Sequence, residues 1–165
     1  MDKFGELLAR SQRFRGIDET LRSDGYPAPN RFTPVDLCEV ESAEALLGLR
    51  FPEQLRRFYL EVGYGDFNLG TNGKRSFMGY DFFHPREAAL KTNHESDDYM
   101  VWEGGTDDRL LRFASRIDYF FYTYNLERGD LVSIGNLCGD TVLSSDLCEL
   151  LHNMESGAEF YYPHE

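Results

Sequence analysis

The stretch best suited to binding or to chemistry is an acidic segment that also carries large aromatic residues. No Lys or Arg lies between Thr92 and Asp108, while six carboxylates fall between Glu95 and Asp108. Tyrosine and tryptophan set among acids favour a protein interface, where such rings serve as anchors. The alternative is a solvated helix end followed by a loop, with Trp102 packed in the core. The candidate contact residues are Glu95, Asp97, Asp98, Tyr99, Trp102, Glu103, Asp107 and Asp108.

Metal binding is a weaker interpretation of the same segment. The pairs Asp97-Asp98 and Asp107-Asp108 offer the oxygen ligands that Ca²⁺ takes, but their spacing lacks the regular alternation of an EF-hand loop. None of the four histidines stands four residues from another, so the sequence contains no helical zinc pair. We therefore expect neither a metal site nor a cofactor.

Nucleophilic catalysis also lacks its usual motifs in this sequence. No GxSxG elbow occurs, and no histidine adjoins Cys38, Cys138 or Cys148. Cys148 falls on an apolar helix face, where we expect it to pack as a small hydrophobic residue. A small hydrolase stays an alternative, and it requires His84 or His94 to converge in space with a carboxylate or a cysteine. Otherwise we expect no catalytic residue.

A glycine-rich turn at residues 63–67 is interpreted as structural. It lacks the GxGxxG continuation and the Lys-Ser/Thr pair of a phosphate-binding loop, and it follows a predicted helix where such loops follow a strand. Glu61 and Asp66 flank this turn. They form a second pair of candidate contacts for a partner.

Length and charge restrict the classes of partner. The chain has 165 residues, a length typical of one domain, and we expect a single domain over residues 1–165. The net charge is −12, which disfavours nucleic acids and anionic membranes because their phosphates would repel it. The same charge favours a basic protein as partner.

The expected location is the cytoplasm. The three cysteines form no CxxC pair, which is typical of reduced thiols, and the first residues contain no apolar core of a signal peptide. No apolar run approaches the length of a membrane span.

Helices are predicted for most of the first half of the chain. Apolar residues at helical spacing predict an amphipathic helix over residues 2–14, and three prolines predict a loop over residues 23–34. Ser42 is typical of an N-cap and Gly48 of a helix stop, which predicts a short helix over residues 43–47.

A second helix is predicted to open at Phe51-Pro52, because proline suits the first turn of a helix, where its missing N–H costs no hydrogen bond. Gly63 is expected to end it. The apolar face that it would bury consists of Leu55, Phe58, Tyr59 and Val62.

Antiparallel strands are predicted for the second half. Residues 67–83 favour a hairpin that turns at Thr71-Asn72-Gly73, since Asn-Gly is a strong turn signal. This order, without βαβ alternation, predicts an α+β fold in which an antiparallel β-sheet packs against flanking helices. The other predicted elements are a helix over residues 85–98, strands over 117–124, 131–134 and 140–144, and a helix over 147–154 capped by Asp146.

The segment Leu46 to Phe67 resembles the signature of the SUKH family, which includes fungal regulators of the Smi and Knr type. A short helix ends in Leu-Gly, an apolar-Pro step opens a second helix, and a glycine-rich turn leads into the first strand. Residues 42–67 therefore form the signature part of a SUKH-like domain, preceded by the N-terminal helix and loop of residues 1–34. The signature positions are Gly48, Pro52, Gly63 and Gly65.

The resemblance implies a binding protein and not an enzyme. Bacterial SUKH domains are mostly immunity proteins that bind and neutralise a toxin domain, often a basic nuclease, and the acidic charge of this chain agrees with such a partner. The alternative within the family is a regulatory scaffold of the Smi/Knr type that binds an endogenous cytosolic protein. Whether the chain is a monomer or a homodimer stays open.

Overall fold

A computed structural model describes residues 31–67, 80–93, 110–116, 120–135, 139–144 and 146–156. The described strands are β1 (Arg31–Thr33), β2 (Tyr64–Phe67), β3 (Tyr80–Phe82), β4 (Leu110–Arg116), β5 (Phe120–Asn125), β6 (Leu131–Gly135) and β7 (Gly139–Ser144). The described helices are α2 (Leu37–Leu47), α3 (Glu53–Glu61), α4 (Pro85–Thr92) and α5 (Leu147–Ser156).

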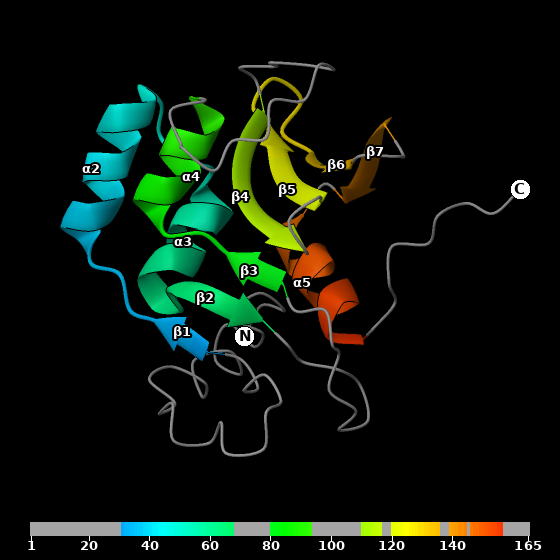
Figure 1. Cartoon of the computed structure of the whole chain (residues 1–165), viewed down its shortest axis with the longest axis horizontal. Coiled ribbons are helices and arrows are strands. Elements are labelled where there is room, and N and C mark those ends of the chain that lie inside the picture. Colours follow the sequence, from blue (N-terminus) through cyan, green and yellow to red (C-terminus); the bar gives the residue numbers. More distant parts are fainter. Residues whose placement is uncertain are drawn as a thin grey trace, which may run out of the picture.

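The described strands form one sheet whose spatial order is the order of the chain, from β1 to β7. Each strand runs antiparallel to the next, which makes the sheet a meander with α4 inserted between β3 and β4. Figure 1 shows α2 outermost on one side, α4 between α2 and β4, and α5 below β5 and to the right of β3. The predicted α+β fold is confirmed.

Aromatic rings from three elements form the centre of the core. The ring of Phe58 on α3 lies 5.7 Å from that of Phe32 on β1 and 4.8 Å from that of Phe82 on β3. Such tilted and edge-on pairs stabilise a core beyond the area that they bury. The predicted apolar face of α3 is confirmed, since Leu55, Phe58, Tyr59 and Val62 are all buried.

The last helix closes the core against α3. Asp146 caps α5, because its Oδ1 accepts the N–H of Cys148 at 2.6 Å, as the sequence predicts. The side-chain oxygen of Gln54 on α3 accepts the N–H of Leu147 at 2.8 Å. Four α5 side chains are then buried: Leu147, Leu150, Leu151 and Met154.

The start of α2 corrects the sequence prediction. The helix begins at Leu37 with Asp36 as its N-cap, whereas a shorter helix capped by Ser42 was expected. Asp36 and Glu39 form a capping box that satisfies two N–H groups at once and therefore defines an earlier start. Ser42 lies inside the helix and donates its hydroxyl to the carbonyl of Cys38.

Two strands were not predicted as such. Arg31–Thr33, part of the expected loop over residues 23–34, is strand β1, because Phe32 is buried and the backbone pairs with β2. Leu110–Arg116 is strand β4, in the middle of the sheet. The strand expected over residues 117–124 is described as Phe120–Asn125, and residues 117–119 lie outside the described part.

The helix expected over residues 85–98 ends earlier in the structure. The helix α4 stops at Thr92, and Asn93 is its C-cap, whose side-chain amide donates to the carbonyl of Leu46 at 3.1 Å. That bond holds the ends of α2 and α4 together. Residues 94–98, the expected helix over 2–14 and the turn at 71–73 lie outside the described residues.

Strands β6 and β7 agree with the predictions, and β2 pairs with β3 as the expected hairpin requires. The expected turn over residues 63–67 is corrected, because Tyr64–Phe67 is strand β2 and only Gly63 precedes it. No helix in the described part of the chain is long and apolar enough to cross a lipid bilayer.

Candidate partner-binding surface

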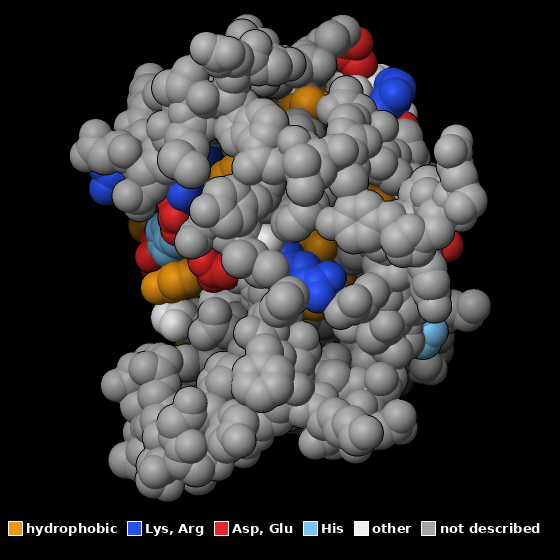
Figure 2. Space-filling view, turned by 45° about the vertical axis from the view of Figure 1, so that its right-hand side comes forward, with side chains coloured by type: hydrophobic (Ala, Val, Ile, Leu, Met, Phe, Trp, Pro, Cys, Tyr) orange, Lys and Arg blue, Asp and Glu red, His pale blue; other side chains and the backbone are white. Residues whose placement is uncertain are grey.

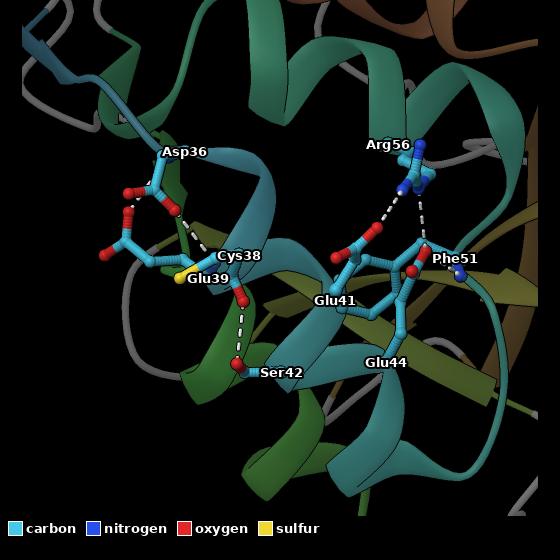
Figure 3. A network of polar contacts seen from close by, with 8 residues as sticks. All are labelled: Asp36, Cys38, Glu39, Glu41, Ser42, Glu44, Phe51 and Arg56. Atoms are coloured by element: carbon cyan, nitrogen blue, oxygen red, sulfur yellow. Dashed lines mark hydrogen bonds and ion pairs between the residues drawn. The ribbon is translucent and has the colours of Figure 1, made fainter.

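Acidic residues gather on α2 and at its N-cap. No Lys or Arg lies between Val35 and Leu49. Figure 3 shows that the four acids of this stretch divide into two groups, one in the first helical turn and one facing Arg56 of α3. The first group is Asp36 and Glu39, and the second is Glu41 and Glu44.

The first group is fixed by backbone hydrogen bonds. The N–H of Glu39 donates to Oδ1 of Asp36 at 2.9 Å, and the N–H of Asp36 donates to Oε2 of Glu39 at 2.9 Å. The hydrogen bond from the Glu39 N–H is the main reason why the pKa of Asp36 is lower than its usual value. Negative charge at the start of α2 also suits the helix dipole.

His84 connects this group to α4. Its Nδ1 accepts the N–H of Arg86 at 3.1 Å and so caps α4, which places the ring proton on Nε2. Nε2 then donates to Oε1 of Glu39 across 3.3 Å. The edge of the ring packs on Tyr64, with 4.8 Å between ring centroids. Both ring nitrogens are therefore used to position the ends of two helices.

This geometry bears on the hydrolase alternative. His84 does meet a carboxylate, as that alternative requires, but the Glu39 carboxylate caps α2, Nδ1 of His84 caps α4, and Nε2 is bound to Glu39. A general base needs a free ring nitrogen that faces a substrate. The second histidine of the alternative, His94, lies outside the described residues.

The second acidic group is anchored by a largely buried cation. Nε of Arg56 lies 3.2 Å from Oε1 of Glu44, and this oxygen also accepts the N–H of Phe51 at 3.0 Å. The side chains of Arg56 and Glu44 are only 15% and 12% exposed, whereas that of Glu41, 3.7 Å from Arg56, is 60% exposed. Glu44 is thus part of the α2–α3 joint, and Glu41 is the acid that faces outward.

Cys38 lies beside the acidic first turn and is exposed. A hydrogen bond to Asp36 and the negative charge of that carboxylate raise the pKa of the Cys38 thiol. The thiol is therefore kept protonated and is a weak nucleophile at neutral pH. Cys148 is partly buried against the core, as the sequence predicts.

Most of the predicted contact residues lie outside the part of the chain that the structure describes. The acidic, aromatic segment from Glu95 to Asp108 lies outside the described residues, so those contacts stay predictions. Asp66 lies in β2, where its backbone pairs with Arg31 and Asp81. The Oε1 atom of Glu61 lies 2.6 Å from Nε of Arg57, one helical turn earlier on α3, so its charge is partly balanced.

The four signature positions have structural roles. Gly48 ends α2 in the left-handed region with φ of 75°, and Pro52 is the N-cap of α3. Gly63 and Gly65 also have positive φ, of 117° and 132°. A Cβ atom at Gly63 would lie 1.9 Å from the carbonyl oxygen of Thr33, so β1 can cross this point only because no side chain is present.

The outward side of α2 was missed by the sequence reasoning, although a signal was available. The pattern Asp36-x-x-Glu39 before an apolar run is a capping box, and it would have extended the helix to Leu37. On the face shown in Figure 2, the few described charged side chains that are visible include both acidic and basic ones. Among the described residues no cluster of three or more His, Cys, Asp or Glu is arranged to hold a metal ion.

Comparison with known proteins gives two matches. Immunity protein YxxD of Bacillus subtilis strain 168 is 28% identical over 134 residues, which cover 80% of this chain and 88% of that protein. The model of the SMI1/KNR4 family (SUKH-1) matches residues 34–165. That match includes the two helices and the glycine turn of residues 42–67 and every described element after β1. The chain therefore belongs to the SMI1/KNR4 (SUKH-1) family.

Proposed function

We propose that this chain is an immunity protein, which binds a bacterial toxin and neutralises it by direct contact. The observation that carries the proposal is the family match over residues 34–165, together with a relative named as an immunity protein that is matched over 88% of its length. In this role the protein is an inhibitor and not an enzyme, and the chain over residues 1–165 acts as one domain.

A basic toxin suits the charge of the molecule. The net charge is −12, and α2 bears acids without a single Lys or Arg between Val35 and Leu49. Complementary charge accelerates encounter between proteins and suppresses wrong partners. A nuclease toxin is a natural partner class, because carboxylates can occupy the positions where such an enzyme binds the phosphates of its substrate.

The acidic segment from Glu95 to Asp108 is the proposed electrostatic contact, with Glu61 and Asp66 as lesser contributors. Its support is its composition: acids interleaved with Tyr99 and Trp102. Large rings bury apolar area at little cost in conformational entropy, and the acids around them orient a basic partner. The expected compartment is the bacterial cytoplasm, where a producing cell meets its own toxin.

Co-expression with the toxin domain encoded next to this gene tests the proposal. We expect growth to be rescued and the purified proteins to elute as one complex with equal amounts of both chains, measured by size-exclusion chromatography with light scattering. A toxin from an unrelated locus serves as the control and should kill despite co-expression. Absence of both rescue and complex would reject the immunity role. If the chain instead co-purifies with an endogenous protein and no toxin gene lies nearby, the regulatory-scaffold alternative would be favoured.

A further inference from the structure

The outward side of α2 is composed unlike a surface helix. Two rows of residues spaced four apart cover it, Leu37, Glu41 and Ala45 in one row and Cys38, Ser42 and Leu46 in the other, and all six are exposed. We call these six residues the α2 outer face. Surface helices usually carry charged and polar residues on their solvent side, yet this face has one charged side chain, Glu41.

Large apolar side chains are concentrated there. Leu37, Leu46 and Leu49 are 48%, 40% and 50% exposed, and they are the exposed large hydrophobic residues among those that the structure describes. Leu49 lies outside the six residues of the face and directly follows Gly48, the C-cap of the same helix. Scattered exposed leucines need no explanation, but two on one helix with a third beside its C-cap favour an interaction surface.

Two polar groups of the α2 outer face, those of Ser42 and Cys38, already have hydrogen-bond partners within the protein. The hydroxyl of Ser42 donates to the carbonyl of Cys38 at 2.7 Å, inside the helix itself. The Cys38 thiol is held protonated by Asp36, as described above. Between the flanking leucines the side chains of Cys38, Ser42 and Ala45 are small. A second helix can therefore approach closely, with its own side chains between the two rows.

The charge of the α2 outer face favours a basic partner over a second copy of this chain. In a two-fold contact with a second copy the face would meet itself, and its six residues offer Glu41 no Lys or Arg. Each copy also carries a net charge of −12, which opposes self-association. A basic partner meets the opposite situation, because Asp36, Glu39 and Glu41 lie along the margin and centre of the face.

We propose that the α2 outer face docks an amphipathic helix of a basic partner protein, with apolar side chains toward the leucines and Lys or Arg toward Glu41 and the first-turn acids. The partner is the toxin of the proposed function, on which this inference rests. None of the six residues belongs to the segment 95–108, so the face offers the toxin a contact with an apolar centre in addition to the predicted electrostatic one.

Charge substitutions at Ala45, in the middle of the face, test this. Binding of the catalytically inactivated toxin domain from the neighbouring gene is measured by calorimetry for the wild type, Ala45→Arg and Ala45→Glu. The two variants add similar bulk with opposite charge. We expect Ala45→Arg to weaken binding at least about tenfold and Ala45→Glu to weaken it clearly less. The control His152→Arg adds the same charge at an exposed position of α5 and should bind within about twofold of the wild type.

Two further measurements make the outcome decisive. The thermal unfolding temperature of Ala45→Arg must equal that of the wild type, as expected for a substitution at an exposed residue. In the complex of the wild type with the toxin, Cys38 should be protected from maleimide labelling, measured by peptide mass spectrometry. Equal toxin binding by the wild type and Ala45→Arg, with Cys38 still labelled, overturns the docking proposal while the immunity role stands. A wild-type protein that binds no toxin instead rejects the proposed function. A wild-type dimer that Ala45→Arg dissociates would show that a second copy is the occupant.

Discussion

At the residue scale, hydroxyl groups buried with and without partners should behave in opposite ways. The phenol oxygens of Tyr59 and Tyr124 are buried and have no hydrogen-bond partner among the described residues. The hydroxyl of Thr92, also buried, donates to the carbonyl of Ala88 at 2.7 Å and accepts the N–H of Arg112 at 3.0 Å. A buried polar group without a partner costs free energy, whereas a paired one is costly to remove.

Replacing these hydroxyls tests that difference. We expect Tyr59→Phe and Tyr124→Phe to leave the free energy of unfolding unchanged or to raise it by up to about 1 kcal/mol, because an unpaired hydroxyl is removed. Thr92→Val should lower it by about 1–3 kcal/mol, because the N–H of Arg112 loses its acceptor. Urea unfolding at neutral pH measures all three. A clear loss of stability in both Tyr→Phe variants would contradict the assignment of unpaired phenols.

The same two tyrosines should control stability at alkaline pH. Burial is the main cause that raises the pKa of both phenols far above the usual value of about 10. The unfolded chain releases these protons near pH 10 while the folded chain keeps them. Their contribution to stability is therefore complete below pH 10 and is lost as the pH rises above it. We expect the double variant Tyr59→Phe/Tyr124→Phe to lose less stability than the wild type between pH 9 and pH 11, measured by urea unfolding at each pH.

The Cys38 thiol gives a second prediction from a shifted pKa. Because Asp36 raises the pKa of this thiol, its reaction with a disulfide reagent should begin at a higher pH than that of an unperturbed cysteine. Asp36→Asn removes the charge but keeps a good N-cap, so labelling of Cys38 at pH 8 should become faster without loss of helix. Peptide mass spectrometry separates Cys38 from the other cysteines. An unchanged rate in Asp36→Asn would exclude the carboxylate as the cause.

At the element scale, the two glycines on either side of α3, Gly48 before it and Gly63 after it, should tolerate alanine very differently. Both Gly48 and Gly63 have positive φ, but a Cβ atom at Gly48 would meet nothing within 4 Å, while one at Gly63 would lie 1.9 Å from the oxygen of Thr33. We expect Gly48→Ala to cost about 1 kcal/mol of stability, from backbone strain alone. Gly63→Ala adds a clash with β1 and should cost about 3–5 kcal/mol, measured by urea unfolding. Similar losses of stability in the two variants would mean that β1 shifts to make room for the Cβ atom at residue 63.

The elements show where reasoning from sequence succeeds. Gly48, Pro52 and the apolar face of α3 were predictable because each depends on local chemistry, a cap or a periodic pattern. Strand β1 was not predictable in the same way, because three residues beside prolines become a strand only through pairing with β2 and burial of Phe32. Tertiary contacts that override local propensity leave no local pattern.

The candidate binding surfaces divide in the same manner. The acids of α2 were visible in the sequence, but which of them faces outward depends on Arg56, twelve residues after Glu44, folding back to bind that acid. The α2 outer face likewise became recognisable only when α4 was seen to cover the opposite side of the helix. Sequence gives the composition of a surface, whereas exposure is set by packing.

At the scale of the whole molecule, the proposed electrostatic contact predicts a salt-dependent association rate. Replacing Asp97, Asp98, Asp107 and Asp108 by Asn should slow association with the toxin by about tenfold at low salt and weaken the dependence of that rate on salt. Dissociation should change much less. Stopped-flow measurements across ionic strengths test this, with the exposed acids Glu53 and Glu127 neutralised as a control. An association rate unaffected at low salt would remove this segment from the encounter surface.

The strand order of the sheet also affects how the chain is synthesised. Each described strand pairs with the described strands next to it along the chain, so a nascent polypeptide can add these strands one by one as it leaves the ribosome, without waiting for a distant partner. The core is nevertheless completed last, because α5 must pack on α3, and the Gln54–Leu147 bond joins residues 93 positions apart. A product truncated before α5 would leave the side of the core that Leu147, Leu150 and Leu151 cover open to solvent. We therefore expect such a product to be degraded, and the protein to accumulate in the cell only when translation has included α5.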